Sequence, residues 1–390
     1  MSRVLAVSGA LVLGLAAAVG AKAAGKWEAA LYLAGDSDLW QTAQYAADRL
    51  MAGAPGIDLV VFLDGPPGSA SRGRFSARRD SGWRHEDWGR VNTGAAATLR
   101  HFTRSALAAS AAPRRLLLIL GHGRPPASIS ASWRVIYQAG GLGVDWSAGG
   151  DCLTPAEVEW ALCGQRWDVV VLACCYSMSM EMGWSLRGTG GMLVGAPGTV
   201  SISGAELVEF VGALGAHSTP FAAARAAAAM LGAGEEDFGA GWAETRGMVV
   251  LGNLVKELGA AMLEDAPRSV AGLEVVRPLV QTWGPGGEIA DLGALAQALS
   301  DALPTARGRE AARALARAAG AVVRLTAREQ ARRLEGKLRP AGLGIFLPPP
   351  HTEPWAEYES EVPFGRVSGW VATLTELYKA LAPLGANQAY

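Results

Sequence analysis

Residues 115–123 read RLLLILGHG, and residues 167–175 read WDVVVLACC. Each stretch contains an uninterrupted apolar run, at 116–120 and at 169–173, that leads into residues able to carry chemistry. Continuously apolar strands are typical of a parallel sheet that is buried on both faces. The two runs therefore predict central strands of such a sheet, with His122 just past the carboxyl end of one and Cys174 and Cys175 just past the end of the other.

Other apolar runs at 27–34, 57–63 and 192–196 alternate with helical patterns. This alternation predicts a doubly wound α/β domain with a mostly parallel sheet. Residues 65–91 lack periodicity, which indicates a long loop or a small hairpin, and we expect residues 121–150 to be irregular. After residue 203 the chain becomes rich in Ala and in helical patterns, so we expect a helix-rich C-terminal extension.

The first residues have the pattern of an export signal. Arg3 is followed by an apolar run at 4–19 and by an A-x-A cleavage pattern at Ala21 to Ala23. The alternative is an N-terminal membrane anchor, but the run of about 16 residues is shorter than the ~20 that span a bilayer. We therefore expect residues 1–23 to be a signal peptide, and the mature protein to be periplasmic or secreted with no stable membrane anchor.

The overall composition excludes several classes of protein. Half of the residues are hydrophobic and 18% are charged, which excludes a disordered chain. The formal net charge is −1, so a nucleic-acid partner is not expected. Four cysteines in 390 residues are too few for a disulfide-stapled scaffold.

A His and a Cys at the ends of neighbouring strands are a candidate catalytic pair. The imidazole can take the thiol proton and later return it to a leaving amine, while the thiolate attacks a carbonyl carbon. A glycine after the histidine lets a backbone N–H approach a developing oxyanion. From these residues alone, His122 is equally consistent with an ordinary loop histidine, and the two cysteines with small core side chains.

The order of several short motifs resembles the clostripain family of cysteine peptidases, in the caspase-like clan. The similar segments are 27–39 WEAALYLAGDSDL, 117–123 LLILGHG, 151–158 DCLTPAEV, 170–175 VVLACC followed by Glu181, 194–195 VG, 291–295 DLGAL, 342–348 GLGIFLP and Trp370. The resemblance implies a caspase-like peptidase domain over residues 24–203. Residues 204–390 would complete or extend this fold.

The resemblance also implies roles for individual residues. His122 matches the catalytic histidine of the family and Cys175 its nucleophile, because Glu181 follows Cys175 by six residues as in the family motif. Backbone N–H groups of Gly123 and Cys175 would form the oxyanion hole. If the register slips by one residue, Cys174 becomes the nucleophile.

The sequence departs from the family pattern in the substrate pocket. The acid that the family places two residues before the nucleophile, associated with Arg or Lys at the P1 position of the substrate, is Ala173 here. Without a carboxylate the pocket loses its charge-assisted pairing with a basic side chain, so we expect a different P1 preference. Glu206 is a candidate replacement acid, although a Glu at a helix start is the commoner interpretation.

These observations predict an exported cysteine endopeptidase that cleaves proteins or peptides. The alternative is a non-catalytic exported binding protein on the same fold, suggested by the missing acid at Ala173. No metal ligands are evident from spacing and no cofactor is required by the sequence, while calcium is implied as an option by the resemblance alone.

Overall fold

The computed structural model describes residues 27–385, except for 54–55, 70–72, 80–81, 126, 132–133, 139, 234–238, 327–336 and 351–355. The expected signal peptide at 1–23 lies outside the described residues. Within them, no helix combines the length and apolar character needed to cross a bilayer.

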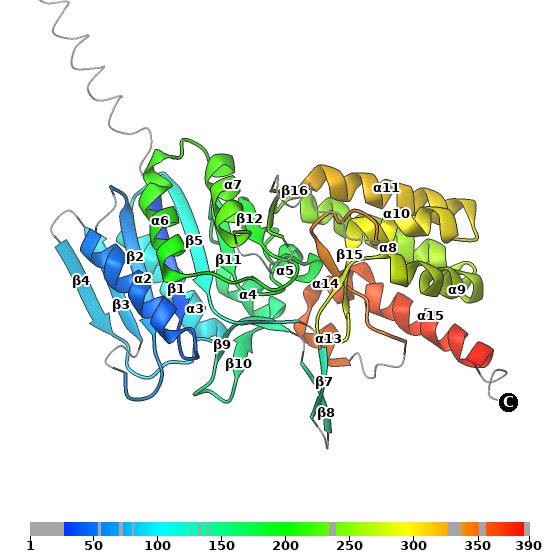
Figure 1. The fold of residues 1–390 in the computed structure, drawn as a ribbon, viewed down its shortest axis with the longest axis horizontal. Coiled ribbons are helices and arrows are strands. Elements are labelled where there is room, and N and C mark those ends of the chain that lie inside the picture. The colour runs from blue at the N-terminus through cyan, green and yellow to red at the C-terminus, as the bar shows by residue number, and fades with distance from the viewer. Residues whose placement is uncertain are drawn as a thin grey trace, which may run out of the picture.

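A nine-stranded sheet forms the centre of the molecule (Figure 1). Its strands, in spatial order, are β16 (Val323–Leu325), β13 (Gly241–Glu244), β12 (Met192–Gly195), β11 (Val169–Ala173), β5 (Arg114–Leu120), β1 (Trp27–Ala34), β2 (Asp58–Asp64), β3 (Arg74–Arg79) and β4 (Gly82–Asp87). The five neighbouring strands from β12 to β2 run parallel to one another. On each side of them two further strands follow, and each of these pairs antiparallel with the strand before it. The predicted α/β fold with a mostly parallel sheet is confirmed.

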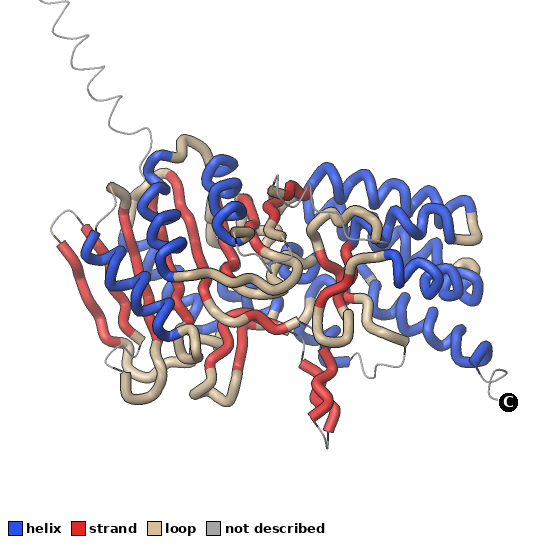
Figure 2. The backbone as a smooth tube through the Cα atoms, in the orientation of Figure 1, coloured by secondary structure: helices blue, strands red, loops and turns tan. Residues whose placement is uncertain are grey.

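Helices cover both faces of this sheet (Figure 2). One face packs against α2 (Trp40–Gly53), α6 (Gly204–Ala213) and α7 (Pro220–Leu231), and the other against α3 (Ala96–Ala109), α4 (Pro155–Leu162) and α5 (Met180–Ser185). Successive strand residues alternate between the two layers: Leu118 joins the α2 side and Ile119 the α3 side, and both are fully buried. This double burial explains why the central runs 116–120 and 169–173 are apolar throughout.

Two segments without periodicity contain regular structure. The stretch at 65–91 includes the antiparallel pair β3 and β4, as the hairpin alternative predicted. The expectation of an irregular segment at 121–150 was wrong, because it contains β6 (Gly123–Arg124), β7 (Ala127–Ala131), β8 (Arg134–Gln138) and β9 (Gly141–Asp145). Strand β9 pairs with β6 and with β10 (Asp151–Leu153) in a small sheet. Its sequence, GLGVD, is buried throughout, and its glycines hide the strand pattern.

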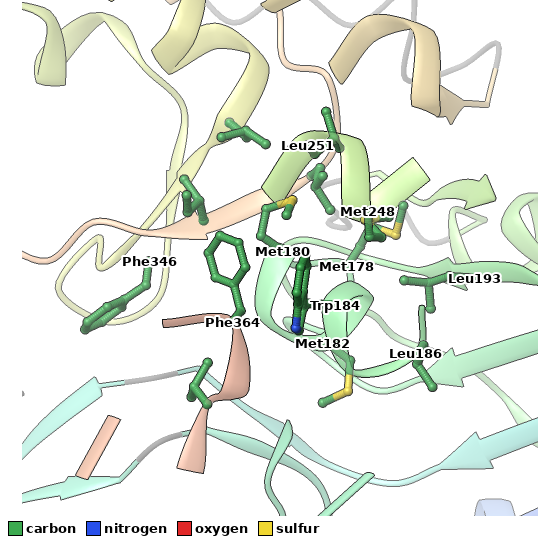
Figure 3. Close-up of a cluster of buried hydrophobic side chains, with 14 of the residues drawn as sticks. Met178, Met180, Met182, Trp184, Leu186, Leu193, Met248, Leu251, Phe346 and Phe364 are labelled. Atoms are coloured by element: carbon green, nitrogen blue, oxygen red, sulfur yellow. The ribbon is translucent and has the colours of Figure 1, made fainter. Parts of the chain in front are cut away.

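The chain after residue 203 adds to the sheet and builds a helical layer beside it (Figure 1). Its remaining elements are η1 (Leu214–Ala216), α8 (Gly247–Leu263), α9 (Ala266–Val276), η2 (Arg277–Leu279), β14 (Thr282–Trp283), β15 (Ile289–Asp291), α10 (Leu292–Ala302), α11 (Ala306–Val322), β17 (Gly344–Phe346), α13 (Ala356–Glu361), α14 (Pro363–Ser368) and α15 (Trp370–Gly385). A methionine-rich cluster joins α5 to α8 and α14, with Met182, Trp184, Met248 and Phe364 in one buried core (Figure 3). The boundary at residue 203 stays a prediction.

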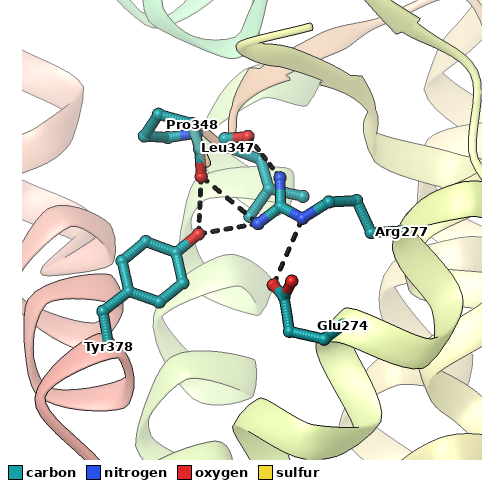
Figure 4. Close-up of polar contacts among 5 residues, drawn as sticks. All are labelled: Glu274, Arg277, Leu347, Pro348 and Tyr378. Carbon is teal, nitrogen blue, oxygen red and sulfur yellow. Dashed lines mark hydrogen bonds and ion pairs between the residues drawn. The ribbon is translucent and has the colours of Figure 1, made fainter. Parts of the chain in front are cut away.

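Two polar side chains, the buried Asp291 and the partly buried Arg277, fix the C-terminal region. The carboxylate of Asp291 accepts hydrogen bonds from the backbone N–H groups of Ala294, Ala341 and Gly342 at 2.8, 2.9 and 2.8 Å. The side chain of Arg277 donates to the carbonyl oxygens of Leu347 and Pro348, to the Tyr378 hydroxyl and to Glu274 (Figure 4). The segments DLGAL and GLGIFLP are therefore held together by the Asp291 carboxylate.

Candidate active site

The strands that precede His122 and Cys175 are paired in register. Strands β5 and β11 are parallel, and Leu120 lies opposite Ala173. His122 and Cys175 each lie two residues beyond this pair, past the carboxyl ends of their strands. Loops that follow the carboxyl ends of parallel strands are where α/β proteins place their reactive groups.

Gly123 brings the two loops into direct contact. A Cβ atom built on Gly123 would lie 1.8 Å from the carbonyl oxygen of Cys175 and 2.8 Å from its backbone nitrogen. Any side chain at this position would therefore collide with the backbone of the Cys175 loop. The glycine is required by close packing of the histidine loop against the cysteine loop.

Cys175 is half-buried beneath the chain that follows β12. The backbone N–H of Val200 donates to the Cys175 sulfur at 3.4 Å, and the N–H of Tyr176 donates to the carbonyl oxygen of Gly198 at 2.8 Å. Tyr176 has a φ of +56°, a left-handed conformation that costs energy for a bulky side chain. Strain of this kind is concentrated at functional loops.

Cys174 has a different environment from its neighbour. Its side chain is fully buried in the core on the α3 side of the sheet, and its sulfur lies 3.6 Å from the carbonyl oxygen of Ile119. Burial raises the pKa of the Cys174 thiol, which disfavours the thiolate. These properties match a small core side chain better than a nucleophile.

The imidazole of His122 contacts the carboxylate of Asp38, which was not among the predicted site residues. Its Nε2 atom lies 2.5 Å from Oδ1 of Asp38, with the two side chains 36% and 65% exposed. The ring of Trp146 lies almost parallel to the imidazole, with 6.2 Å between the centroids. In the sequence, Asp38 appeared only within the segment 27–39 that resembles the clostripain family. Strands β1 and β5 are parallel neighbours, so the residues that follow them lie side by side.

The residues near the expected P1 pocket carry no free acid at the predicted positions. Ala173 ends β11, is 2% exposed, and belongs to the apolar layer on the α2 side. The Glu206 carboxylate accepts hydrogen bonds of 2.8 Å from both the backbone N–H and the hydroxyl of Ser203. Glu206 thus forms the capping box that begins α6.

Glu181 has a structural position six residues after Cys175. It is buried, and its carboxylate accepts hydrogen bonds from the backbone N–H of Phe346 at 2.9 Å and from the Tyr358 hydroxyl at 2.6 Å. Burial raises its pKa. Glu181, whose spacing from Cys175 identified the predicted nucleophile, therefore connects the cysteine loop to the C-terminal region.

Three buried carboxylates lie beside the turn that carries Asp38. Oxygen atoms of Asp36, Asp64 and Asp145 lie within 4.8 Å of one another, a grouping able to hold a cation. Their hydrogen-bond donors include the backbone N–H groups of Gly73 and Thr93. Burial raises the pKa of Asp64 to about 7. No metal ligands were predicted from residue spacing, because the members of this group lie on three separate strands or turns.

Comparison with known proteins decides the family. The model of the clostripain family, Peptidase C11, matches residues 32–232. The chain belongs to the clostripain family. This membership makes it a cysteine peptidase, a hydrolase, and it confirms the resemblance that the sequence motifs indicated.

Solved structures of clostripain-family proteases share the fold. An inactive zymogen C11 protease from Parabacteroides distasonis is 14% identical, with a TM-score of 0.64 over 88% of this chain and 98% of that chain. A secreted C11 cysteine protease from Bacteroides thetaiotaomicron, in complex with an irreversible peptide inhibitor, is 14% identical, with a TM-score of 0.60 over 89% and 99%. A further structure of a secreted C11 protease from that organism, "iotapain", is 12% identical, with a TM-score of 0.59 over 88% and 99%. Comparison with curated protein sequences finds no match.

Proposed function

We propose that this clostripain-family peptidase is an exported endopeptidase that cleaves peptide bonds with Cys175 as nucleophile and His122 as general base and acid. One observation carries the proposal: Leu120 and Ala173 lie opposite each other, and His122 and Cys175 follow them by the same two residues. The approach of Gly123 to the Cys175 carbonyl supports it, because this approach brings the two loops together.

The reaction has two halves. In acylation, the Cys175 thiol gives its proton to His122, and the sulfur bonds to the peptide carbonyl carbon. When the tetrahedral intermediate collapses, its C–N bond breaks and His122 protonates the departing amine. In deacylation, water gives a proton to His122 and its oxygen bonds to the thioester carbon. The C–S bond then breaks, and the Cys175 sulfur recovers the proton.

Backbone N–H groups of Gly123 and Cys175 are proposed to stabilise the oxyanion in both halves. Both groups belong to the two loops that Gly123 brings into contact. A side chain on residue 123 would block this approach, so the proposal accounts for the glycine that follows the histidine. Such donors typically contribute about 3–4 kcal/mol to transition-state stabilisation.

The proposed P1 preference excludes Arg and Lys. Ala173 supplies no carboxylate, and the Glu206 carboxylate is engaged by Ser203 at the start of α6. A desolvated cationic side chain would therefore lack a partner at either position. An uncharged P1 side chain suits the apolar layer to which Ala173 belongs.

Export and the absence of a membrane anchor are proposed from the N-terminal sequence. The pattern at residues 1–23 supports them, as does the description of two structural relatives as secreted proteases. The expected partner is a protein or peptide substrate, as the family implies. Calcium remains a prediction from the resemblance, and assays with and without EDTA test it.

Cleavage of a peptide library tests the proposed function. The wild-type protein should hydrolyse internal peptide bonds under reducing conditions. Cys175→Ala and His122→Ala should lose turnover by at least about 10³-fold. Cys174→Ala is the matched control and should keep most of its activity. A folded wild-type protein without turnover would favour the non-catalytic binding protein.

A further inference from the structure

We infer that Asp38 is a positioning residue for His122, so that the proposed catalytic pair works as a Cys175–His122–Asp38 arrangement. The inference rests on the proposed function and adds a third side chain to it. Its evidence is the 2.5 Å contact between His122 Nε2 and Asp38 Oδ1. The two residues are 84 positions apart in the sequence.

The backbone around Asp38 is well anchored. The N–H of Ser37 donates to the Gly35 carbonyl oxygen at 2.7 Å, and the Ser37 hydroxyl accepts from the N–H of Leu39 at 3.2 Å. Just before this turn, the carbonyl oxygen of Asp36 accepts from the N–H of Trp146 at 3.0 Å. The turn that presents Asp38 is thus tied to the residue whose ring lies against His122.

The contact selects the role of each imidazole nitrogen. In the neutral ring only one nitrogen carries a proton, and an Nε2–H that donates to Asp38 leaves Nδ1 as the proton acceptor. Nδ1 is then the atom that takes the thiol proton of Cys175. The imidazolium formed in this transfer is stabilised by the Asp38 carboxylate. The Trp146 ring lies parallel to the imidazole, with 6.2 Å between the centroids.

Three substitutions at Asp38 distinguish the effect of its charge from the effect of its size and hydrogen bonding. Asp38→Asn keeps an acceptor but removes the charge, Asp38→Ala removes both, and Asp38→Glu restores the charge on a longer side chain. Loss of the corresponding carboxylate from a buried triad costs about 10⁴-fold in kcat. Because Asp38 is 65% exposed, its effect should be weaker, about 10- to 100-fold for Asn and Ala. Asp38→Glu should recover part of the loss.

The pattern of the losses distinguishes positioning from a structural or substrate-binding role. The loss should fall on kcat, with KM within about twofold of wild type, because Asp38 acts through His122. The rate at which iodoacetamide alkylates Cys175 should fall with kcat, since it reports the thiolate without a peptide substrate. Thermal midpoints should match that of Asp48→Asn, a control at another exposed aspartate, on α2.

The outcomes separate this inference from the proposed function. Reduced kcat and alkylation in Asp38→Asn, partial recovery in Asp38→Glu and wild-type behaviour in Asp48→Asn would support it. A second outcome is that the wild type is active, His122→Ala is inactive and Asp38→Asn has the kcat and alkylation rate of wild type. This outcome would overturn the positioning role and leave the catalytic pair supported. Absence of turnover in the wild-type protein would contradict both the proposed function and the positioning role of Asp38.

Discussion

The hydroxyl of Tyr358 donates a 2.6 Å hydrogen bond to Glu181, across 177 residues of sequence and within the protein core. Glu181 lies in the first turn of α5, the helix that follows the Cys175 loop, and Tyr358 lies on α13 in the C-terminal region. The backbone N–H of Phe346 donates to the same carboxylate oxygen. The cysteine loop is therefore connected directly to the last part of the chain.

Tyr358→Phe should destabilise the protein. The substitution leaves a buried carboxylate with one donor fewer, which costs about 1–3 kcal/mol in the free energy of unfolding. Urea denaturation measures this change, and Tyr45→Phe at an exposed tyrosine is the control. An unchanged midpoint for Tyr358→Phe would show that the bond to Glu181 contributes nothing to stability.

Gly123→Ala should abolish activity. Its added methyl group would lie 1.8 Å from the Cys175 carbonyl oxygen, and the conflict is with backbone atoms that have little room to move. We expect a loss of at least about 100-fold in kcat/KM, since small displacements of catalytic groups have costs of that size. Gly53→Ala is the control, because nothing lies within 4 Å of a Cβ at that position. Equal activities of the two variants would argue against tight packing between the loops.

Stability should depend on the ionisation of Asp64. Burial raises its pKa to about 7 in the folded protein, above the ordinary value of 3.8. Between these values the folded state holds a proton that the unfolded state has lost. The contribution of this group therefore decreases as the pH rises from about 4 to 7.

Asp64→Asn removes this titration. The variant should gain stability relative to wild type as the pH is raised from 5 to 8, by on the order of 2–4 kcal/mol at most. Chemical denaturation of both proteins at each pH provides the comparison. A difference that does not change with pH would mean that Asp64 ionises in the folded protein as it does in the unfolded chain.

Ala173→Asp should change P1 preference. An acid two residues before Cys175 restores the position that the family associates with basic P1 residues, so cleavage after Arg and Lys should increase at least about tenfold relative to uncharged residues. Circular dichroism checks that the variant folds, because Ala173 is buried. Efficient cleavage after Arg by the wild-type enzyme would contradict the proposed role of this position.

The sequence predicted the five parallel strands of the central sheet because both of their faces are buried. Runs such as 116–120 and 169–173 are apolar at every position, so their signal does not depend on packing partners. Strand β9 was not predicted, because two glycines interrupt its apolar pattern.

Only the part of the site that directly follows predicted strands could be predicted from the sequence. His122 and Cys175 follow the runs that form β5 and β11, so the topology of a parallel sheet places them at one edge. Asp38 could not be chosen in the same way, because a carboxylate in a turn has many roles and its partner is set by tertiary structure. The difference between Cys174 and Cys175 likewise depends on which side chain faces the core.

The central claim is that Cys175 is the nucleophile, and covalent labelling tests it most directly. An irreversible peptide probe should be incubated with the reduced wild-type protein, and the modified residue should then be located by peptide mass spectrometry. The account predicts one adduct, on Cys175, that persists in Cys174→Ala and is strongly reduced in His122→Ala. A probe that labels Cys174 instead, or that leaves Cys175 unmodified in an active enzyme, would contradict it.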